Sequence, residues 1–474
     1  MSALALDRRR VAKNTFSQIV AFGISGATKA VVAVVVARTL GPQGFGLFTL
    51  AWTIASMVAL FAPLGLDYRL VRELNRDGTS REVDVSLPPA LLSACVGSVL
   101  VAGIPWIAGA SHQLVLALAA GGLFVVLSAP VLILRAAFHA RERMELETLA
   151  LAVEGLVGLG GVAIALSISG SVPAAMLGLA AGRVANLVVS IRCYRSQYGK
   201  LGFKVQVNEW PGLLRVAVPM GFSYIFNSLL VRFDIVLLAM LRTPEEIGLY
   251  SAATIIIMTI PMVSSALNTS LYPVLSRARS SDDPELKTLF ASTYRMQLVV
   301  GLAAAAGLMV LARPISDLLY GSSFVGTAAV IVALAPILPF RFVNSLSGVA
   351  LNATDRQRSR TVATAIGASA NIALNLALIP FWGYKGAIVA TLATEAILTI
   401  VMRRHLADLA PSLLKPLAQG AVAAGGLALV VMVTPGHVLL RTSVGAAAFG
   451  VLAWLIVWSG KVVGSTPRAE EARA

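Results

Sequence analysis

The feature that most constrains this chain is a succession of apolar runs, each about twenty residues long, separated by short polar loops. Because a helix rises about 1.5 Å per residue, twenty residues cross the roughly 30 Å hydrocarbon core of a bilayer. The 57% share of hydrophobic residues exceeds the roughly 45 to 50% of soluble domains. The sequence therefore predicts an all-α polytopic membrane protein with about fourteen transmembrane helices, at 16–37, 45–66, 87–108, 114–134, 149–168, 172–191, 213–240, 247–271, 289–311, 324–346, 362–380, 384–402, 414–433 and 439–458.

Positive charge divides unevenly between the loops on the two sides of these predicted helices. The chain has 38 Lys and Arg against 23 Asp and Glu, and the basic clusters fall in alternate loops. The basic loops include those that carry Arg72, Arg141, Arg195, Arg277 and Arg356. This pattern predicts that these loops and both termini are cytoplasmic, and it does not indicate a nucleic-acid partner. The longest loops, 67–86 and 192–212, leave no room for a soluble domain.

An internal repeat relates the first half of the chain to the second. A shift of 202 residues (244 − 42) aligns Pro42 with Pro244 and Gly46 with Gly248. Six predicted helices separate the equivalent segments, and an even number preserves orientation across the membrane. We therefore predict two parallel six-helix lobes, with two extra helices and a tail after them; the three regions are 1–208, 209–405 and 406–474.

Several motifs resemble one family of membrane transporters. They are the run from Ala37 to Phe48, Arg232-Phe233-Asp234, the run from Gly248 to Ala253, the run from Tyr272 to Ser276, and the run from Asn371 to Pro380. In order and spacing they are similar to the polysaccharide-transporter branch of the multidrug/oligosaccharidyl-lipid/polysaccharide flippase superfamily, through the twelfth predicted helix.

This resemblance implies two lobes that face a central cleft, which opens alternately to either side of a bacterial cell membrane. It further implies transfer of undecaprenyl-pyrophosphate-linked oligosaccharide to the periplasmic leaflet, with cleft cations receiving the pyrophosphate. The expected partners are the lipid-linked oligosaccharide, membrane lipids and polysaccharide polymerase machinery.

Cations lie within the predicted membrane helices, where each costs roughly 2.5 to 3.5 kcal/mol on insertion scales. Arg295 and Arg341 lie near helix ends, from which long side chains can reach the interface. Three others lie deeper, and the repeat shift brings Lys29 to position 231 (29 + 202), beside Arg232. The candidates for binding a diphosphate are therefore Arg232, Lys29, Arg183, Arg341, Arg295 and Arg215.

Acidic and amide side chains also lie in these helices. Asp234 and Glu395 are candidates for coupling transport to a proton or sodium gradient, and the alternative is that each is a counter-ion of an arginine. Asn371 and Asn375 lie one helical turn apart and share a face. Their amides either line the cleft or bond to neighbouring helices.

Two other functions are open to such a chain. A drug or cation antiporter of the same superfamily would need acids and aromatics in its cleft, whereas cations outnumber acids here. A membrane-embedded polymerase or glycosyltransferase usually has a long outer loop, and these loops are short. No Walker motif occurs, and the four histidines lack metal-ligand spacing, so the sequence predicts neither cofactor nor metal.

Overall fold

The structure is a computed structural model that describes residues 3–76, 80–231, 233–276, 284–411 and 425–426, and all regular structure within them is helical. The chain divides into two compact units, Met1–Gly248 and Leu249–Ala474, which we call unit 1 and unit 2. The repeat places the boundary between its copies at 208/209, and that division of the chain stays a prediction.

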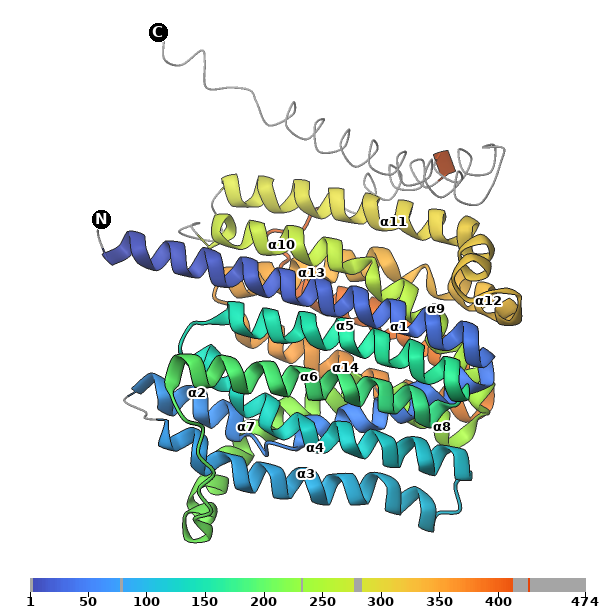
Figure 1. Ribbon diagram of the computed structural model, residues 1–474. Helices are drawn as coiled ribbons and strands as arrows, with labels where there is room; N and C mark the ends of the chain where they lie inside the picture. Colours follow the sequence, from blue (N-terminus) through green and yellow to red (C-terminus); the bar gives the residue numbers. More distant parts are fainter. Residues whose placement is uncertain (1–2, 77–79, 232, 277–283, 412–424, 427–474) are drawn as a thin grey trace, which may run out of the picture. The chain divides into compact units, whose positions relative to one another are not determined.

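Unit 1 contains eight helices and one short 3₁₀ turn among its described residues, and the ninth helix begins in it. Within it, α5 and α6 pack along each other, and α4 packs against α3 and α6 (Figure 1). The elements are α1 (Ala3–Phe61), α2 (Leu66–Arg76), α3 (Arg81–Ile107), α4 (His112–Ala140), α5 (Met144–Ser169), α6 (Val172–Tyr198), η1 (Val207–Glu209), α7 (Trp210–Val231), α8 (Phe233–Leu241) and α9 (Pro244–Thr259).

The first two predicted membrane segments form the single broken helix α1. Gly41 interrupts it with a left-handed φ of 68°, and Pro42 follows directly. Only glycine adopts that backbone geometry at little cost, and the proline removes a helix hydrogen bond. The break predicted between 37 and 45 is therefore present at Gly41, but it is a kink of one residue rather than a loop.

The predicted loop at 67–86 was also wrong, since it contains helix α2 and the start of α3. Leu66, Leu70 and Leu74 recur every fourth residue on α2, and all three are buried in the core of unit 1. The remaining positions are largely polar, so an average over twenty residues conceals the amphipathic pattern.

The residues that the repeat aligns meet one another within unit 1. A Cβ atom on Gly46 would overlap the carbonyl oxygen of Pro244, and one on Gly248 would overlap that of Pro42. The contact is therefore reciprocal, as expected where two equivalent segments pack across an approximate two-fold axis. Any side chain at either glycine would push the two backbones apart.

Unit 2 continues α9 and adds six further helices among its described residues. In it α13 packs against α10, α11 and α15, and α14 packs along α15 (Figure 1). The elements are α10 (Pro261–Leu275), α11 (Pro284–Tyr320), η2 (Ser322–Phe324), α12 (Val325–Leu334), α13 (Ile337–Ala353), α14 (Gln357–Trp382) and α15 (Tyr384–His405). Pro261 begins α10, and the segments 322–334 and 337–353 are bent by 52°.

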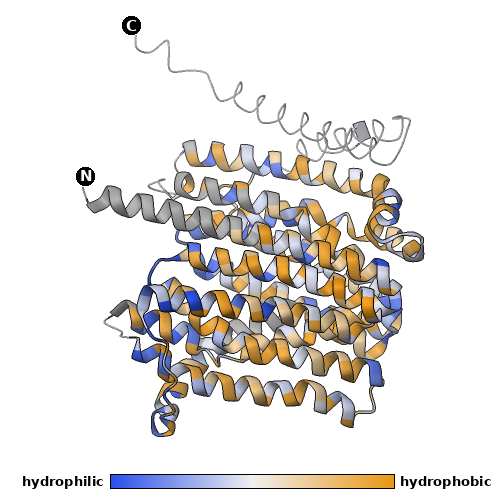
Figure 2. Cartoon of the chain, viewed as in Figure 1, coloured by the Kyte–Doolittle hydropathy of each residue, from blue (hydrophilic) through white to orange (hydrophobic). Residues whose placement is uncertain are grey.

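Eight described helices are long and apolar enough to cross a membrane, or nine if the bent pair counts as one span. Apolar residues cover the helix bodies and polar residues gather at their ends (Figure 2). Several apolar side chains of α3 are exposed, among them Val99, Ile104 and Ile107, as expected for a helix that faces lipid. The predicted fold class, an all-α polytopic membrane protein, is confirmed. The predicted helices at 414–433 and 439–458 lie outside the described residues, apart from 425 and 426.

Candidate functional site

Unit 1 contains an ion pair between its membrane helices α5 and α6. Nη2 of Arg183 lies 3.1 Å from Oε1 of Glu154, and the Arg183 side chain is only 15% exposed. Nδ2 of Asn186 donates to Oε2 of Glu154 at 2.6 Å, and Ser190 donates to the Asn186 oxygen. Arg183, Asn186 and Ser190 follow the i, i+3, i+7 spacing of one helix face, so α6 presents them together to Glu154.

Two further contacts enclose Arg183. Its guanidinium lies 4.3 Å from the centroid of the Phe124 ring on α4, a cation–π distance. The α5 and α6 backbones also approach closely, because a Cβ atom on Gly182 would lie 2.6 Å from the carbonyl oxygen of Glu154. Arg183 is therefore held between a carboxylate and an aromatic ring.

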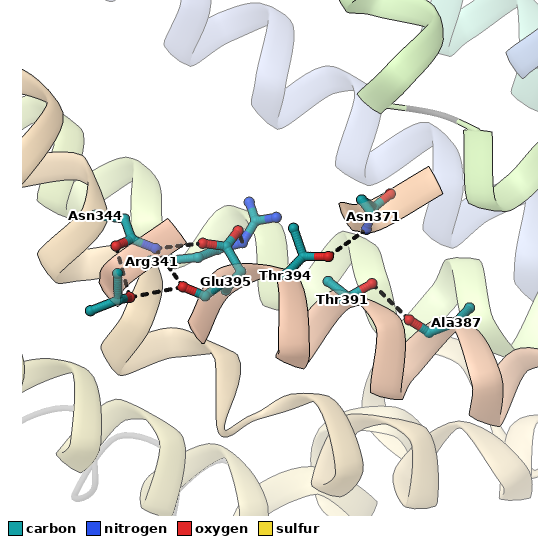
Figure 3. A network of polar contacts seen from close by, with 8 residues as sticks. Arg341, Asn344, Asn371, Ala387, Thr391, Thr394 and Glu395 are labelled. Atoms are coloured by element: carbon teal, nitrogen blue, oxygen red, sulfur yellow. Dashed lines mark hydrogen bonds and ion pairs between the residues drawn. The ribbon is translucent and has the colours of Figure 1, made fainter. Parts of the chain in front are cut away.

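Unit 2 contains a corresponding pair between α13 and α15 (Figure 3). Nε of Arg341 lies 3.1 Å from Oε1 of Glu395, in a geometry that leaves Nε without a hydrogen bond. Asn344 donates from Nδ2 to Oε2 of Glu395 at 2.8 Å and to its backbone carbonyl oxygen at 3.1 Å. Thr399 donates to the Asn344 oxygen at 2.8 Å. The carboxylate is thus fixed more firmly than the arginine.

Arg341 is more open than Arg183. Its side chain is 32% exposed, and its terminal amino groups donate to no partner among the described residues (Figure 3). A guanidinium offers a planar fork of donors that matches the oxygens of phosphate. Arg341 can therefore bind an additional anion without losing its contact with Glu395.

Of the two predicted amide residues, Asn371 connects α14 to α15 next to this pair (Figure 3). Asn371 donates to Oγ1 of Thr394 at 3.2 Å, and Asn375 donates to Oδ1 of Asn371 at 2.9 Å. Their shared face, predicted from the four-residue spacing, is confirmed by this bond. Oδ1 of Asn375 has no hydrogen-bond partner among the described residues, and the whole side chain is buried.

The other predicted site residues are exposed, bonded to the backbone of their own helix, or outside the described residues. Lys29 on α1 and Arg295 on α11 are both exposed, and Arg215 on α7 is exposed as well. Asp234 is in the first turn of α8, where its Oδ1 accepts from the backbone N–H of Ile235. Arg232 lies outside the described residues. Among the described residues, no three His, Cys, Asp or Glu side chains are placed to hold a metal ion.

One charged cluster was missed by the sequence interpretation, which treated Arg135 and His139 as residues of a basic loop. Both lie on the last turns of α4, four residues apart, and both contact the carboxylate of Glu147 on α5. The Arg135 Nε to Glu147 Oε1 distance is 2.6 Å, and Glu147 is only 4% exposed. The i, i+4 spacing was the available signal, but a basic residue at a helix end is usually assigned to the loop.

Family models match the chain in two overlapping parts. A model described as polysaccharide biosynthesis protein matches residues 11–279, and one described as lipid II flippase MurJ matches residues 156–457. Each match covers more than half of the chain. The chain belongs to the polysaccharide-transporter branch of the multidrug/oligosaccharidyl-lipid/polysaccharide flippase superfamily.

A Haloferax volcanii relative named "Probable low-salt glycan biosynthesis flippase Agl15" is 22% identical over 378 residues, 78% of each chain. The fold is similar to that of lipid II flippase MurJ in an inward closed conformation, with a TM-score of 0.74, 15% identity, and coverage of 94% of this chain and 100% of that one. An inward-facing multidrug transporter of the same superfamily gives a TM-score of 0.59 at 15% identity, covering 82% and 98%. This member of the polysaccharide-transporter branch is therefore a flippase of the glycan type with a MurJ-like fold, and not an enzyme.

Proposed function

We propose that this flippase moves an oligosaccharide linked to undecaprenyl pyrophosphate from the cytoplasmic to the periplasmic leaflet of a bacterial cell membrane, by alternating access. Its family membership and its glycan-flippase relative support the class of substrate. The basic loops support an orientation with cytoplasmic termini. Polysaccharide polymerase machinery is the proposed recipient of the product.

The observation that carries this proposal is the open guanidinium of Arg341 in a membrane helix of unit 2. A lipid diphosphate has an anionic head that must leave water, and a cation already within the membrane offsets part of that cost. Arg341 is partly exposed and can donate to phosphate oxygens, while Glu395 keeps it in place. The remaining proposed diphosphate cations are Arg232, Lys29 and Arg295, whereas Arg183 is enclosed by Glu154 and the Phe124 ring and is assigned to helix packing.

Polar contacts nearby suit the sugar portion of such a lipid. Asn371 is half-buried and can meet a sugar hydroxyl, while the buried Asn375 donates to its Oδ1. Glu395 is already engaged by Asn344 and Arg341, which favours its role as a counter-ion. Asp234, whose Oδ1 accepts from the backbone N–H of Ile235, is the other proposed coupling acid.

The test is flipping by the purified protein in liposomes. Polyprenyl-diphosphate sugars should move between leaflets, and a polyprenyl sugar joined through an uncharged linker should move poorly. Cationic drugs loaded into the same vesicles should not be exported. Drug export without diphosphate-lipid flipping would overturn the proposal in favour of an antiporter.

A further inference from the structure

Unit 1 contains a cavity of about 190 Å³ at the ends of α1, α2, α4 and α7. At about 30 Å³ for each water, this volume accommodates several solvent molecules. Its polar lining comes from Asp67, Tyr68, Arg135 and His139, and the remainder is apolar side chains and glycine backbone. The basic loops adjoin these helix ends, so the proposed orientation places the cavity on the cytoplasmic side.

Asp67 and Glu147, the acid that Arg135 and His139 contact, differ in their hydrogen-bond partners. Both oxygens of Glu147 are engaged, one by Arg135 and the other by His139. Oδ1 of Asp67 is buried and has no hydrogen-bond partner among the described residues. A buried carboxylate with an unpaired oxygen pays a desolvation cost that protonation removes.

The surroundings of Asp67 have opposing effects on its pKa. Burial raises the pKa of Asp67 above its usual value, while the backbone N–H groups of Tyr68 and Asp67 and the positive charge of Arg135 partly oppose that rise. Arg135 pairs with Glu147 through its Nε and forms no ion pair with Asp67 among the described residues.

No other described group that lines the cavity carries a charge. The lining from α1 and α7 is apolar or glycine. On α2 itself Arg69 is paired with Glu82 of α3 at 3.0 Å, and Asp84 of α3 accepts from the backbone of Gly202. Asp67, His139 and Arg135 are therefore the charged or titratable acid and base side chains of the described cavity lining.

We propose that Asp67 is a proton-binding site through which this transporter exchanges protons with the cytoplasm. An O–H bond forms on Oδ1 as one breaks on a hydronium ion of the cavity, leaving a water molecule. When Asp67 is protonated and uncharged, Arg135 pairs with Glu147, as it does in the structure. Deprotonated Asp67 competes with Glu147 for Arg135, so proton release favours a different packing of α2 against α4. The link to transport, but not the proton site itself, rests on the proposed function.

Infrared titration tests the proton site without any transport. The wild-type protein should show a carbonyl stretching band of a protonated carboxylic acid that disappears at a higher pH than the band of an ordinary aspartate, because burial raises the pKa of Asp67. Asp67→Asn should remove that band, and Asp67→Glu should shift it. Asp408→Asn should leave it unchanged, because Arg356 bonds to both oxygens of Asp408. A band that persists in Asp67→Asn, or no band in the wild type, would overturn the proposal.

Flipping in liposomes then tests the link to transport. The wild-type rate should vary severalfold across the same titration, and the Asp67→Asn rate should vary by less than about twofold if one group controls the response. An Asp67→Asn rate as pH-dependent as the wild-type rate would refute coupling through Asp67. A loss of flipping in every variant, with the infrared band still assigned to Asp67, would instead count against the proposed function and leave the proton site standing.

Discussion

The intramembrane ion pairs of the two units share their components but differ in openness. Each joins an arginine to a glutamate on a neighbouring helix, and in each an asparagine donates to the same carboxylate, at 2.6 Å from Asn186 and 2.8 Å from Asn344. The arginine side chain of unit 1 is 15% exposed and that of unit 2 is 32% exposed. Arg183 additionally contacts the Phe124 ring.

One charged residue of each pair lies at the same distance from the start of its helix, with the charges exchanged. Arg183 is 11 residues after the first residue of α6 (183 − 172), and Glu395 is 11 residues after the first residue of α15 (395 − 384). Helices α6 and α15 therefore carry opposite charges at the same distance from their first residues. We infer that the unit 1 pair stabilises helix packing, whereas the unit 2 pair keeps a cation available to substrate.

The largest expected difference between the pairs comes from removing each carboxylate charge. Glu154→Gln leaves an enclosed guanidinium without its counter-ion, which should lower the free energy of unfolding by about 3 kcal/mol. The matched variant Glu395→Gln should cost only about 1 kcal/mol, because Arg341 reaches solvent and the pair is worth less there. Thermal unfolding of the detergent-solubilised variants measures both. Equal losses would contradict the distinction between the two pairs.

Removing the arginines separates stability from transport. Arg341→Ala should reduce the flipping rate per folded molecule by about tenfold, equivalent to about 1.4 kcal/mol, because one diphosphate contact is lost. Arg183→Ala should instead lower the amount of folded protein, with less effect on the rate of what remains. Vesicles matched for folded protein allow the comparison, and a greater rate loss in Arg183→Ala would reverse our assignment of roles.

The sequence predicted the fold class but could not distinguish these two arginines. Helix period and apolar length locate α4, α5 and α6 well, because bilayer thickness sets them. Position along the helix, however, made Arg183 a stronger candidate than Arg341 for binding substrate. Position along one helix does not reveal which partner lies on the neighbouring helix. Glu154 and Arg183 are 29 residues apart (183 − 154), and their contact depends on the tight packing of α5 against α6.

Other residues show that a local sequence pattern predicts contacts within one helix but not contacts between helices. The four-residue spacing of Asn371 and Asn375 was sufficient to predict a shared face, because both are on one helix. The cluster of Asp67, Arg135 and Glu147 was not predictable in this way, since it joins α2, α4 and α5. Helix α2 was missed because its three buried leucines repeat over a span too short for a hydropathy average.

The asparagines allow a finer comparison of the two carboxylates. Asn186→Ala should cost about 1 kcal/mol of stability, because it removes a hydrogen bond to a charged group in a closed site. Asn344→Ala should cost a similar amount in stability but also reduce flipping, because Glu395 is then free to move and Arg341 with it. Unfolding and flipping measured on both variants would reveal the difference. An Asn344→Ala protein with full flipping activity would show that Arg341 does not depend on this support.

The smallest effect should come from substitutions that keep the positive charge but change the group that carries it. Arg341→Lys keeps a cation beside Glu395 but replaces the planar fork with a single ammonium, so the flipping rate should fall by only about threefold. Arg183→Lys should leave the rate of folded protein unchanged yet lower stability, because the ammonium stacks less well on the Phe124 ring. The same flipping and unfolding measurements apply. If Arg341→Lys were as impaired as Arg341→Ala, the geometry of the fork rather than the positive charge would be what the substrate requires.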